Sequence, residues 1–262
     1  MTLMRHEMKQ GKTALAIWTL SIGLLMVICI FLFPEMKKEM AGVSKIFASM
    51  GSFTAAFGMD KINFGTLNGF YAIECGNVLG LGGAFFAAMC GASALSKEEK
   101  EHTAEFLLTH PVSRRKIVTE KLAAVLVQII LLNLVIWIVS IASIAGIGEP
   151  ISWKELALLH LAYLLLQMEL AAVCFGISAF STRGSLGIGL GIASIMYFLN
   201  LIANIADTAE FLKYITPFGY AEGSEIMSEA ALDPVLILLG MLYGAIGVAA
   251  AYWKYCRKDI QA

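Results

Sequence analysis

The sequence predicts an all-α membrane protein with six transmembrane helices in a single domain, residues 1–262. Three observations predict this class. Hydrophobic residues make up 58% of the chain and charged residues only 15%, whereas a soluble domain carries about 25% charged residues. Six apolar runs are each long enough to cross a membrane, which takes about 20 helical residues. The Lys and Arg residues gather on one side of these runs, as they do in cytoplasmic loops.

Polar segments separate the six apolar runs. The first run is longer than the apolar part of a signal peptide, has no small-residue cleavage site and is followed by Pro34-Glu35-Met36. We therefore expect it to be a span. The second run can be extended back to Tyr71. The runs comprise residues 14–33, 76–95, 122–146, 156–180, 185–206 and 235–252.

The positive charges predict the orientation of the chain. Six spans place both termini on one side of the membrane, and thirteen of the 19 Lys and Arg residues would lie there. Positively charged loops stay in the cytoplasm, so we expect both termini and the loop at 96–116 to be cytoplasmic. The acidic segment 207–233 suits the outer side, as does the long loop at 34–70, where 46–47 and 53–59 could form short interfacial helices. We expect a multi-pass plasma-membrane protein, and its compactness favours a bacterial one.

The segment from Ser96 to Lys121 is a charged island in an apolar chain. Ser96 and Glu99 have the spacing of a capping box, which predicts that a helix begins there. Pro111 should end that helix, and Ser113 can cap the next one. The short helix either offers an apolar knob to a cytoplasmic partner or is simply a solvated loop. One of its faces would carry Thr103, Phe106, Leu107 and His110.

This loop resembles the motif E-x-G-T-L-E-x-L-L-x-x-P-x-S-R of the type 2 family of ATP-binding-cassette (ABC) exporter permeases. In that family the motif lies between the second and third of six spans. His102 stands where the family usually has Gly, and Ala104 where it often has Leu. The residues that match the motif are Glu101, Thr103, Glu105, Leu107, Leu108, Pro111, Ser113 and Arg114.

A second resemblance precedes the last span. The run Thr216-Pro217-Phe218-Gly219-Tyr220 is similar to the family's SPF-x-Y element, with Thr in place of Ser. The family resemblance implies an amphipathic elbow helix at 1–13, a coupling helix within the cytoplasmic loop and short re-entrant or interfacial outer helices at 207–233. The motif residues expected to matter in the outer helices are Thr216, Pro217, Phe218 and Tyr220.

The resemblance also implies a mechanism and partners. Such permeases form the translocation pathway of an exporter, pair with a second permease in a homodimer or a related heterodimer, and are driven by a separate ATPase that binds ATP and Mg²⁺. The coupling helix would sit in a groove of that ATPase, anchored by Phe106 and Leu107. Arg114 and Arg115 would either pair with the ATPase or hold lipid headgroups. The expected coupling set is Glu101, Thr103, Glu105, Phe106, Leu107, Leu108, Pro111, Arg114 and Arg115.

Motifs for chemistry within this chain are incomplete. Gln10–Thr13 ends like a phosphate-binding loop, but His6 stands where the first Gly belongs and no strand precedes it. The stretch from His6 to Gln10 lacks the second His of a zinc-protease helix. The five Cys residues are scattered and read as apolar fillers. We therefore expect a transport subunit without its own ATP site, cofactor or metal, and with no nucleic-acid partner.

Glu169 is the central polar residue within the spans. It lies roughly 20 Å along the fourth run at 1.5 Å per residue, and a carboxyl group at that depth should face the bundle interior or a wet cavity. It is either a pathway group or a structural group bonded to another span. The intramembrane polar candidates, and its candidate partners, are Gln167, Gln128, Asn133 and Asn200.

Three pairs of glycines have the G-x-x-x-G spacing that lets helices approach closely. We expect most of them to serve packing within the chain, and the pair at Gly187 and Gly191 could instead meet a second permease. The other pairs are Gly76 and Gly80, and Gly240 and Gly244.

Three other classes of function are alternatives to a permease. An ion-driven secondary transporter often has internal repeats and broken helices, and neither is evident. An intramembrane enzyme would need convergent catalytic groups on facing spans, whereas only Glu169 is central. A membrane anchor or sensor that uses an ATPase without moving cargo is the third alternative. The motifs favour the permease subunit of an ABC exporter.

Overall fold

The computed structural model describes residues 2–39, 50–100, 112–181 and 186–258. These residues are helical wherever they are regular and contain no strand, so the all-α prediction is confirmed. The elements are α1 (Thr2–Lys38), α3 (Ser52–Ala56), α4 (Leu67–Phe70), the π-helix η1 (Tyr71–Cys75), α5 (Gly76–Ser93), α6 (Lys97–Lys100), α8 (Arg114–Ile147), α9 (Trp153–Ser178), α10 (Leu186–Ile205), the 3₁₀-helices η2 (Asp207–Tyr214) and η3 (Pro217–Ala221), α11 (Gly223–Glu229) and α12 (Pro234–Arg257).

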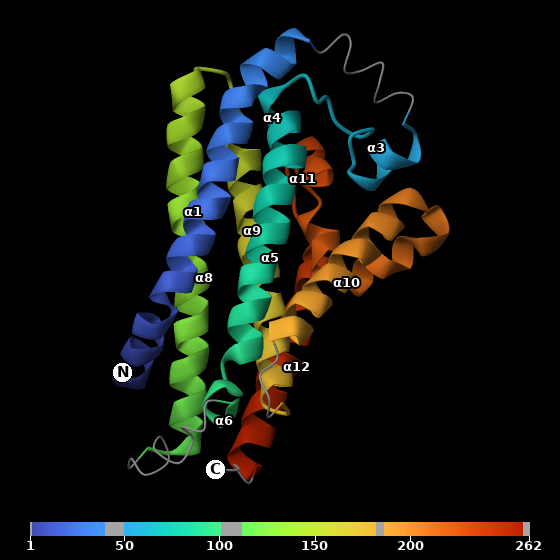
Figure 1. Ribbon diagram of the computed structural model, residues 1–262. Helices are drawn as coiled ribbons and strands as arrows, with labels where there is room; N and C mark the ends of the chain where they lie inside the picture. Colours follow the sequence, from blue (N-terminus) through green and yellow to red (C-terminus); the bar gives the residue numbers. More distant parts are fainter. Residues whose placement is uncertain (1, 40–49, 101–111, 182–185, 259–262) are drawn as a thin grey trace.

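Six of these helical segments are long and apolar enough to span a membrane, which confirms the predicted number. They are α1, the continuous rod formed by α4, η1 and α5, and then α8, α9, α10 and α12. Several extend beyond their apolar runs, because polar residues at the ends can stay helical outside the hydrocarbon. The starts of α1 and α8, α6 and the end of α12 lie at one end of the bundle, the basal end (Figure 1). The short elements α3, α4 and α11 lie at the opposite, apical end.

The segment 1–13 does not form a helix separate from the first span. From Thr2 onward it is the beginning of α1, which continues without a break to Lys38. Contacts with α8 hold this segment: the backbone N–H of Met4 donates to Glu120 Oε2 at 3.0 Å, and Glu7 Oε1 lies 3.0 Å from Lys121 Nζ. The expected boundary at residue 13 is therefore absent, and a position of this segment on the membrane surface stays a prediction.

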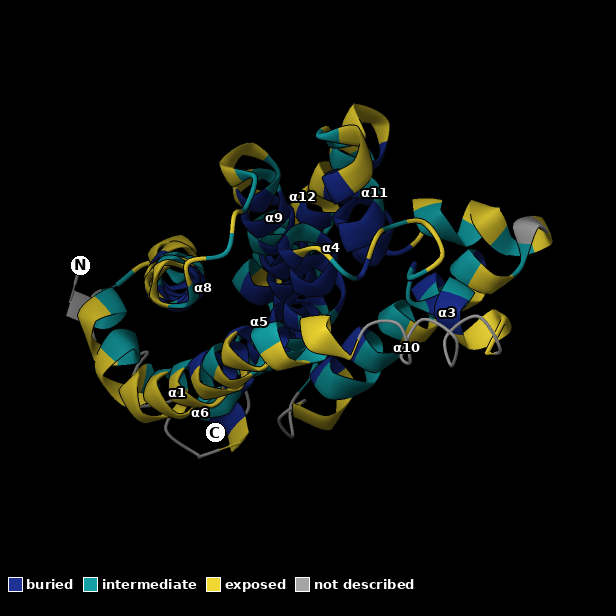
Figure 2. Cartoon of the chain, turned by 90° about the horizontal axis from the view of Figure 1, so that it is seen from above, coloured by how far each residue is buried: buried dark blue, intermediate teal, exposed yellow. Residues whose placement is uncertain are grey.

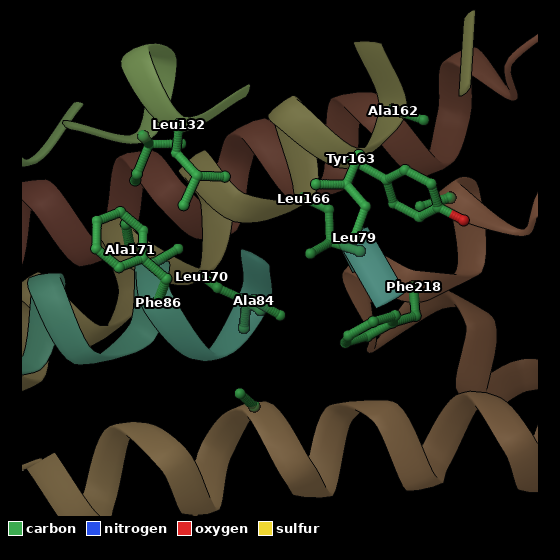
Figure 3. Close-up of a cluster of buried hydrophobic side chains, with 14 of the residues drawn as sticks. Leu79, Ala84, Phe86, Leu132, Ala162, Tyr163, Leu166, Leu170, Ala171 and Phe218 are labelled. Carbon is green, nitrogen blue, oxygen red and sulfur yellow. The ribbon is translucent and has the colours of Figure 1, made fainter. Parts of the chain in front are cut away.

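The rod of α4 to α5 and helix α9 form the centre of the bundle. In each of these spans 61% of the most apolar stretch is buried, against 22% in α1, α10 and α12. Viewed from the apical end, the buried residues concentrate on these central helices, and exposed ones lie on α1, α8 and α10 (Figure 2). Side chains of α5 and α9 meet in the core, where Leu79 lies close to Leu166 and Phe86 to Ala171 (Figure 3).

The remaining spans pack around this centre unequally. Helix α1 packs mainly on α8, and α12 packs mainly on α9. Helix α10 contacts α5 and leans away from the rest of the bundle (Figure 1). Of the short helices predicted at 53–59 and 46–47, the first is found in part as α3, and the second lies outside the described residues.

The glycine pairs divide into two groups. Gly76 and Gly80 adjoin the Tyr163 side chain, where an added Cβ would clash, so this pair serves packing within the chain. Gly240 and Gly244 likewise face α9. In contrast, a Cβ at Gly187 or Gly191 would meet no described atom within 4 Å. Packing within the chain therefore does not account for the pair on α10.

Candidate functional site

The loop at 96–116, which is predicted to contact an ATPase, is described only at its two flanks. Its central residues lie outside the described part of the chain: Glu101, Thr103, Glu105, Phe106, Leu107, Leu108 and Pro111. On one flank, α6 begins at Lys97, directly after Ser96 as expected. The Ser96 hydroxyl donates to the Ala92 carbonyl oxygen at 3.2 Å, and its role as the cap of α6 stays a prediction. On the other flank, Ser113 Oγ accepts from the Lys116 N–H at 3.3 Å, which confirms it as the cap of α8.

A buried lysine joins the flanks of this loop to two spans. Lys121 on α8 is 1% exposed. Its ammonium group donates to the Ala94 carbonyl oxygen at 2.8 Å, lies 3.0 Å from Glu7 Oε1 on α1, and pairs with Glu98 on α6. Two carboxylates and a carbonyl oxygen therefore satisfy the three N–H donors of one lysine. We call these residues (Lys121, Glu7, Glu98 and Ala94) the Lys121 cluster.

The same flanks are also attached to the end of α12. Lys258 Nζ lies 2.7 Å from Glu99 Oε1 on α6. From the other flank, the Arg114 guanidinium donates to the Tyr255 carbonyl oxygen at 3.3 Å and to the carbonyl oxygen of Lys258. Arg114 is thus engaged within the chain, where its cation meets the carbonyl oxygens at a helix C-terminus. Arg115 is exposed.

The structure places Glu169 beside a partner that sequence reasoning did not choose. The Tyr220 hydroxyl donates to Glu169 Oε2 at 2.9 Å, and both side chains are buried. None of the four expected partners bonds to Glu169. Asn133 donates to Gln167 Oε1 at 2.6 Å, and Asn200 donates to Glu222 Oε2 at 3.0 Å. The expectation that these amides serve Glu169 is therefore wrong, because Asn133 and Gln167 pair with each other, Asn200 pairs with Glu222, and the fourth amide lies elsewhere.

That remaining amide, Gln128 on α8, borders a basal cavity of about 340 Å³ between α1, α5 and α8. Its side chain is 7% exposed and lies against Gly11 of α1, where an added Cβ would clash with it. No hydrogen-bond partner of Gln128 is found among the described residues. The polar candidates thus occupy separate places in the bundle and do not form one site.

The motif at 216–220 positions the tyrosine that reaches Glu169. Thr216 Oγ1 accepts from the Phe218 N–H at 3.3 Å, which starts η3, and donates to the Met196 carbonyl oxygen at 2.8 Å on α10. Pro217 occupies the first turn, where its missing N–H is not needed. Phe218 is buried against the Tyr197 ring. Burial and the Glu169 carboxylate raise the pKa of Tyr220, so the hydroxyl remains a donor.

A second charged cluster ties together the apical segments. Glu225 Oε1 on α11 lies 2.9 Å from both Lys61 Nζ and Lys213 Nζ. Burial opposes ionisation of Glu225, but the two lysines outweigh it and hold its pKa below the ordinary value. Burial likewise opposes the charge on Lys61, and Glu225 more than compensates, so the pKa of Lys61 is raised. The sequence contained no signal for this cluster, because Lys61 and Glu225 are far apart along the chain.

Within the described residues, no group of three or more His, Cys, Asp or Glu side chains could hold a metal ion. The resemblance of Gln10–Thr13 to a phosphate-binding loop also finds no structural support, since these residues lie inside α1. A phosphate-binding loop must lie between a strand and a helix, so that its backbone N–H groups can point at the phosphates.

The fold and its polar clusters define a multi-pass helical membrane protein in which the flanks of the basal loop are bound to several spans. Residues 1–260 match the family described as ABC-2 family transporter protein. The chain therefore belongs to the ABC-2 family of transporter permeases. A comparison with curated proteins gives no match.

Proposed function

We propose that this chain is the permease subunit of an ABC exporter and is driven by a separate ATPase that binds the loop at 101–111. ATP and Mg²⁺ would be bound by that ATPase. The ABC-2 family match and the six spans support the transport role. Outward transport and cytoplasmic termini follow from the family resemblance and from the excess of Lys and Arg at the basal end.

The observation that carries the coupling role is the attachment of both loop flanks to the bundle. Glu98 and Glu99 of α6 pair with Lys121 on α8 and with Lys258 after α12. Glu7 extends the Lys121 cluster to α1. When a partner displaces the loop, these ion pairs would pull on α1, α8 and α12 together. A solvated loop without a mechanical role would need none of these buried contacts.

A second permease is the further expected partner. Helix α10 leans outward, and neither Gly187 nor Gly191 is covered by the described residues. Large apolar side chains on the same helix are exposed, among them Ile188 and Ile195. This surface suits contact with another membrane helix, because small residues allow close approach.

Co-purification tests the proposal. The tagged chain is expressed in its native cell and solubilised in mild detergent, and the co-purifying proteins are identified. We expect a stoichiometric ABC ATPase that is lost, by tenfold or more, in the variant Phe106→Ala with Leu107→Ala, because buried aromatic and aliphatic anchors dominate such interfaces.

The apical pair Phe211 and Leu212 offers a matched control. Phe211→Ala with Leu212→Ala removes the same two residue types in η2, which Lys213 joins to Glu225 of the apical helix α11, and Phe211 is exposed there. This variant should retain the ATPase. A wild-type chain that purifies without any ATPase, or a loop variant that still binds it fully, would refute the proposal and favour a secondary transporter.

A further inference from the structure

A membrane-level groove lies between α9, α10 and α12. Its volume is about 460 Å³, within the range of about 300–1,000 Å³ that is usual for sites of drug-sized ligands. Its walls are almost entirely apolar. The side chains that form them include Val173 and Ile177 from α9, Phe180 just after that helix, Ile192 and Met196 from α10, and Ile246 from α12.

The groove follows one face of α9. Glu169, Val173 and Ile177 are spaced by four residues, so they project from the same side of the helix over roughly 12 Å, and Phe180 follows just after the helix ends. Pro217, which precedes the buried Tyr220 in η3, closes the groove at its apical end.

Glycines bring α9 and α12 together along one side of this groove. Gly176 of α9 and Gly247 of α12 touch through their backbones: a Cβ at Gly176 would lie 2.5 Å from the Gly247 carbonyl oxygen. Both glycines line the groove. Their missing side chains therefore let the backbones of α9 and α12 approach closely along this side of the groove.

Glu169 is the only charged residue among the described residues that line the groove. It is 8% exposed. Its Oε2 accepts the Tyr220 hydroxyl, and its Oε1 has no hydrogen-bond partner among the described residues. Gly240 adjoins the same carboxyl group, since a Cβ there would lie 3.0 Å from Glu169 Cδ. Tyr220 and Gly240 thus both adjoin Oε2, and Oε1 is left to bind a ligand.

We propose that this groove binds a lipophilic amine, with its ammonium group at Glu169 Oε1 and its apolar body along Val173, Ile177 and Ile192. A buried carboxylate is costly unless it is paired with a cation or with enough donors. Tyr220 supplies a donor to Oε2, but no lysine, arginine or histidine of the described lining supplies a cation for Oε1. A charge-assisted N–H···O bond to Oε1 provides that pairing. The apolar walls bury the remainder of the ligand. A small inorganic cation has no apolar part and would gain nothing from these walls.

This inference concerns binding, and only the role of the groove as a cargo site rests on the proposed permease function. Binding is measured without ATP or an ATPase, so the two proposals fail separately. An ATPase that never co-purifies leaves the binding result intact, and an absence of amine binding leaves the coupling proposal intact.

The test compares two probes that differ in one group. The full chain, in nanodiscs of zwitterionic lipid, is titrated with naphthyl-butylamine and with naphthyl-butanol, and bound probe is measured by equilibrium dialysis. We expect the amine to bind about tenfold tighter than the alcohol, the difference that about 1.4 kcal/mol of charge pairing produces. Glu169→Gln should remove this difference, because the amide has no charge.

Two further variants secure the interpretation. Glu74→Gln removes a carboxyl group of another span that does not line the groove, and it should keep the preference for the amine. Val173→Trp fills the groove and leaves Glu169 in place, so it should weaken both probes. Equal binding of amine and alcohol to the wild type, no binding of either, or an unchanged preference in Glu169→Gln would overturn the proposal.

Discussion

Replacement of Lys121 by methionine is expected to destabilise the folded chain by about 3–5 kcal/mol, because breaking a buried ion pair leaves its partner charges uncompensated. Lys121 is 1% exposed, and the side chains of Glu7 and Glu98 around it are only 13% and 14% exposed. Methionine has a similar length but supplies no N–H donor. Thermal unfolding of the purified chain in detergent, followed by loss of monodispersity, measures the effect.

Two companion variants distinguish charge pairing from packing at Lys121. Lys121→Arg keeps the positive charge and should retain most of the stability. Adding Glu7→Gln and Glu98→Gln to Lys121→Met removes the uncompensated carboxylates, so part of the lost stability should return. If Lys121→Met unfolds at the wild-type temperature, the Lys121 cluster does not hold the basal end together.

Substitution of Gly91 by alanine should destabilise the contact between α5 and α9 at the bundle centre. A Cβ at Gly91 would clash with the Ala171 carbonyl group and lie 3.0 Å from its carbon, so α5 and α9 would have to separate. We expect a loss of about 1–3 kcal/mol, the usual cost of overpacking. The melting temperature in detergent reports it.

Gly23→Ala is the matched control for this substitution. It makes the same change on α1, where the new Cβ would lie 3.5 Å from Ile136 Cδ1, an ordinary van der Waals contact. Because alanine favours a helix by about 1 kcal/mol over glycine, this variant should be neutral or slightly stabilised. Equal losses in both variants would contradict the packing described for α5 and α9.

Much of the fold could be predicted because the membrane imposes it. Backbone groups in hydrocarbon must bond internally, so long apolar runs become helices, and the six runs did so. Helix ends were predicted less well. The segment before Ala14 continues α1 because Glu7 and Met4 bind α8, and such tertiary contacts leave no trace in a local pattern.

The candidate sites show the same division between local and distant information. The cap at Ser113 could be predicted, because its partner is three residues away. The partner of Glu169 could not be predicted, since Tyr220 lies 51 residues further along the chain. Tyr220 was singled out for its place in the motif at 216–220, and that motif does not indicate contact with Glu169. The Lys121 cluster could not be predicted either. Lys121 and Glu98 both stand in the charged island, but nothing in the local sequence indicates that these charged side chains become buried.

The central claim is that the loop at 101–111 meets an ABC ATPase, and photocrosslinking tests it most directly. A photoreactive phenylalanine analogue is placed at Phe106 in the native cell, with the same analogue at the apical Phe211 as the control. We predict a crosslink from Phe106 to an ABC ATPase and none from Phe211. If Phe106 gives no such crosslink, or if both positions give the same one, the loop is not the coupling element and the account is wrong.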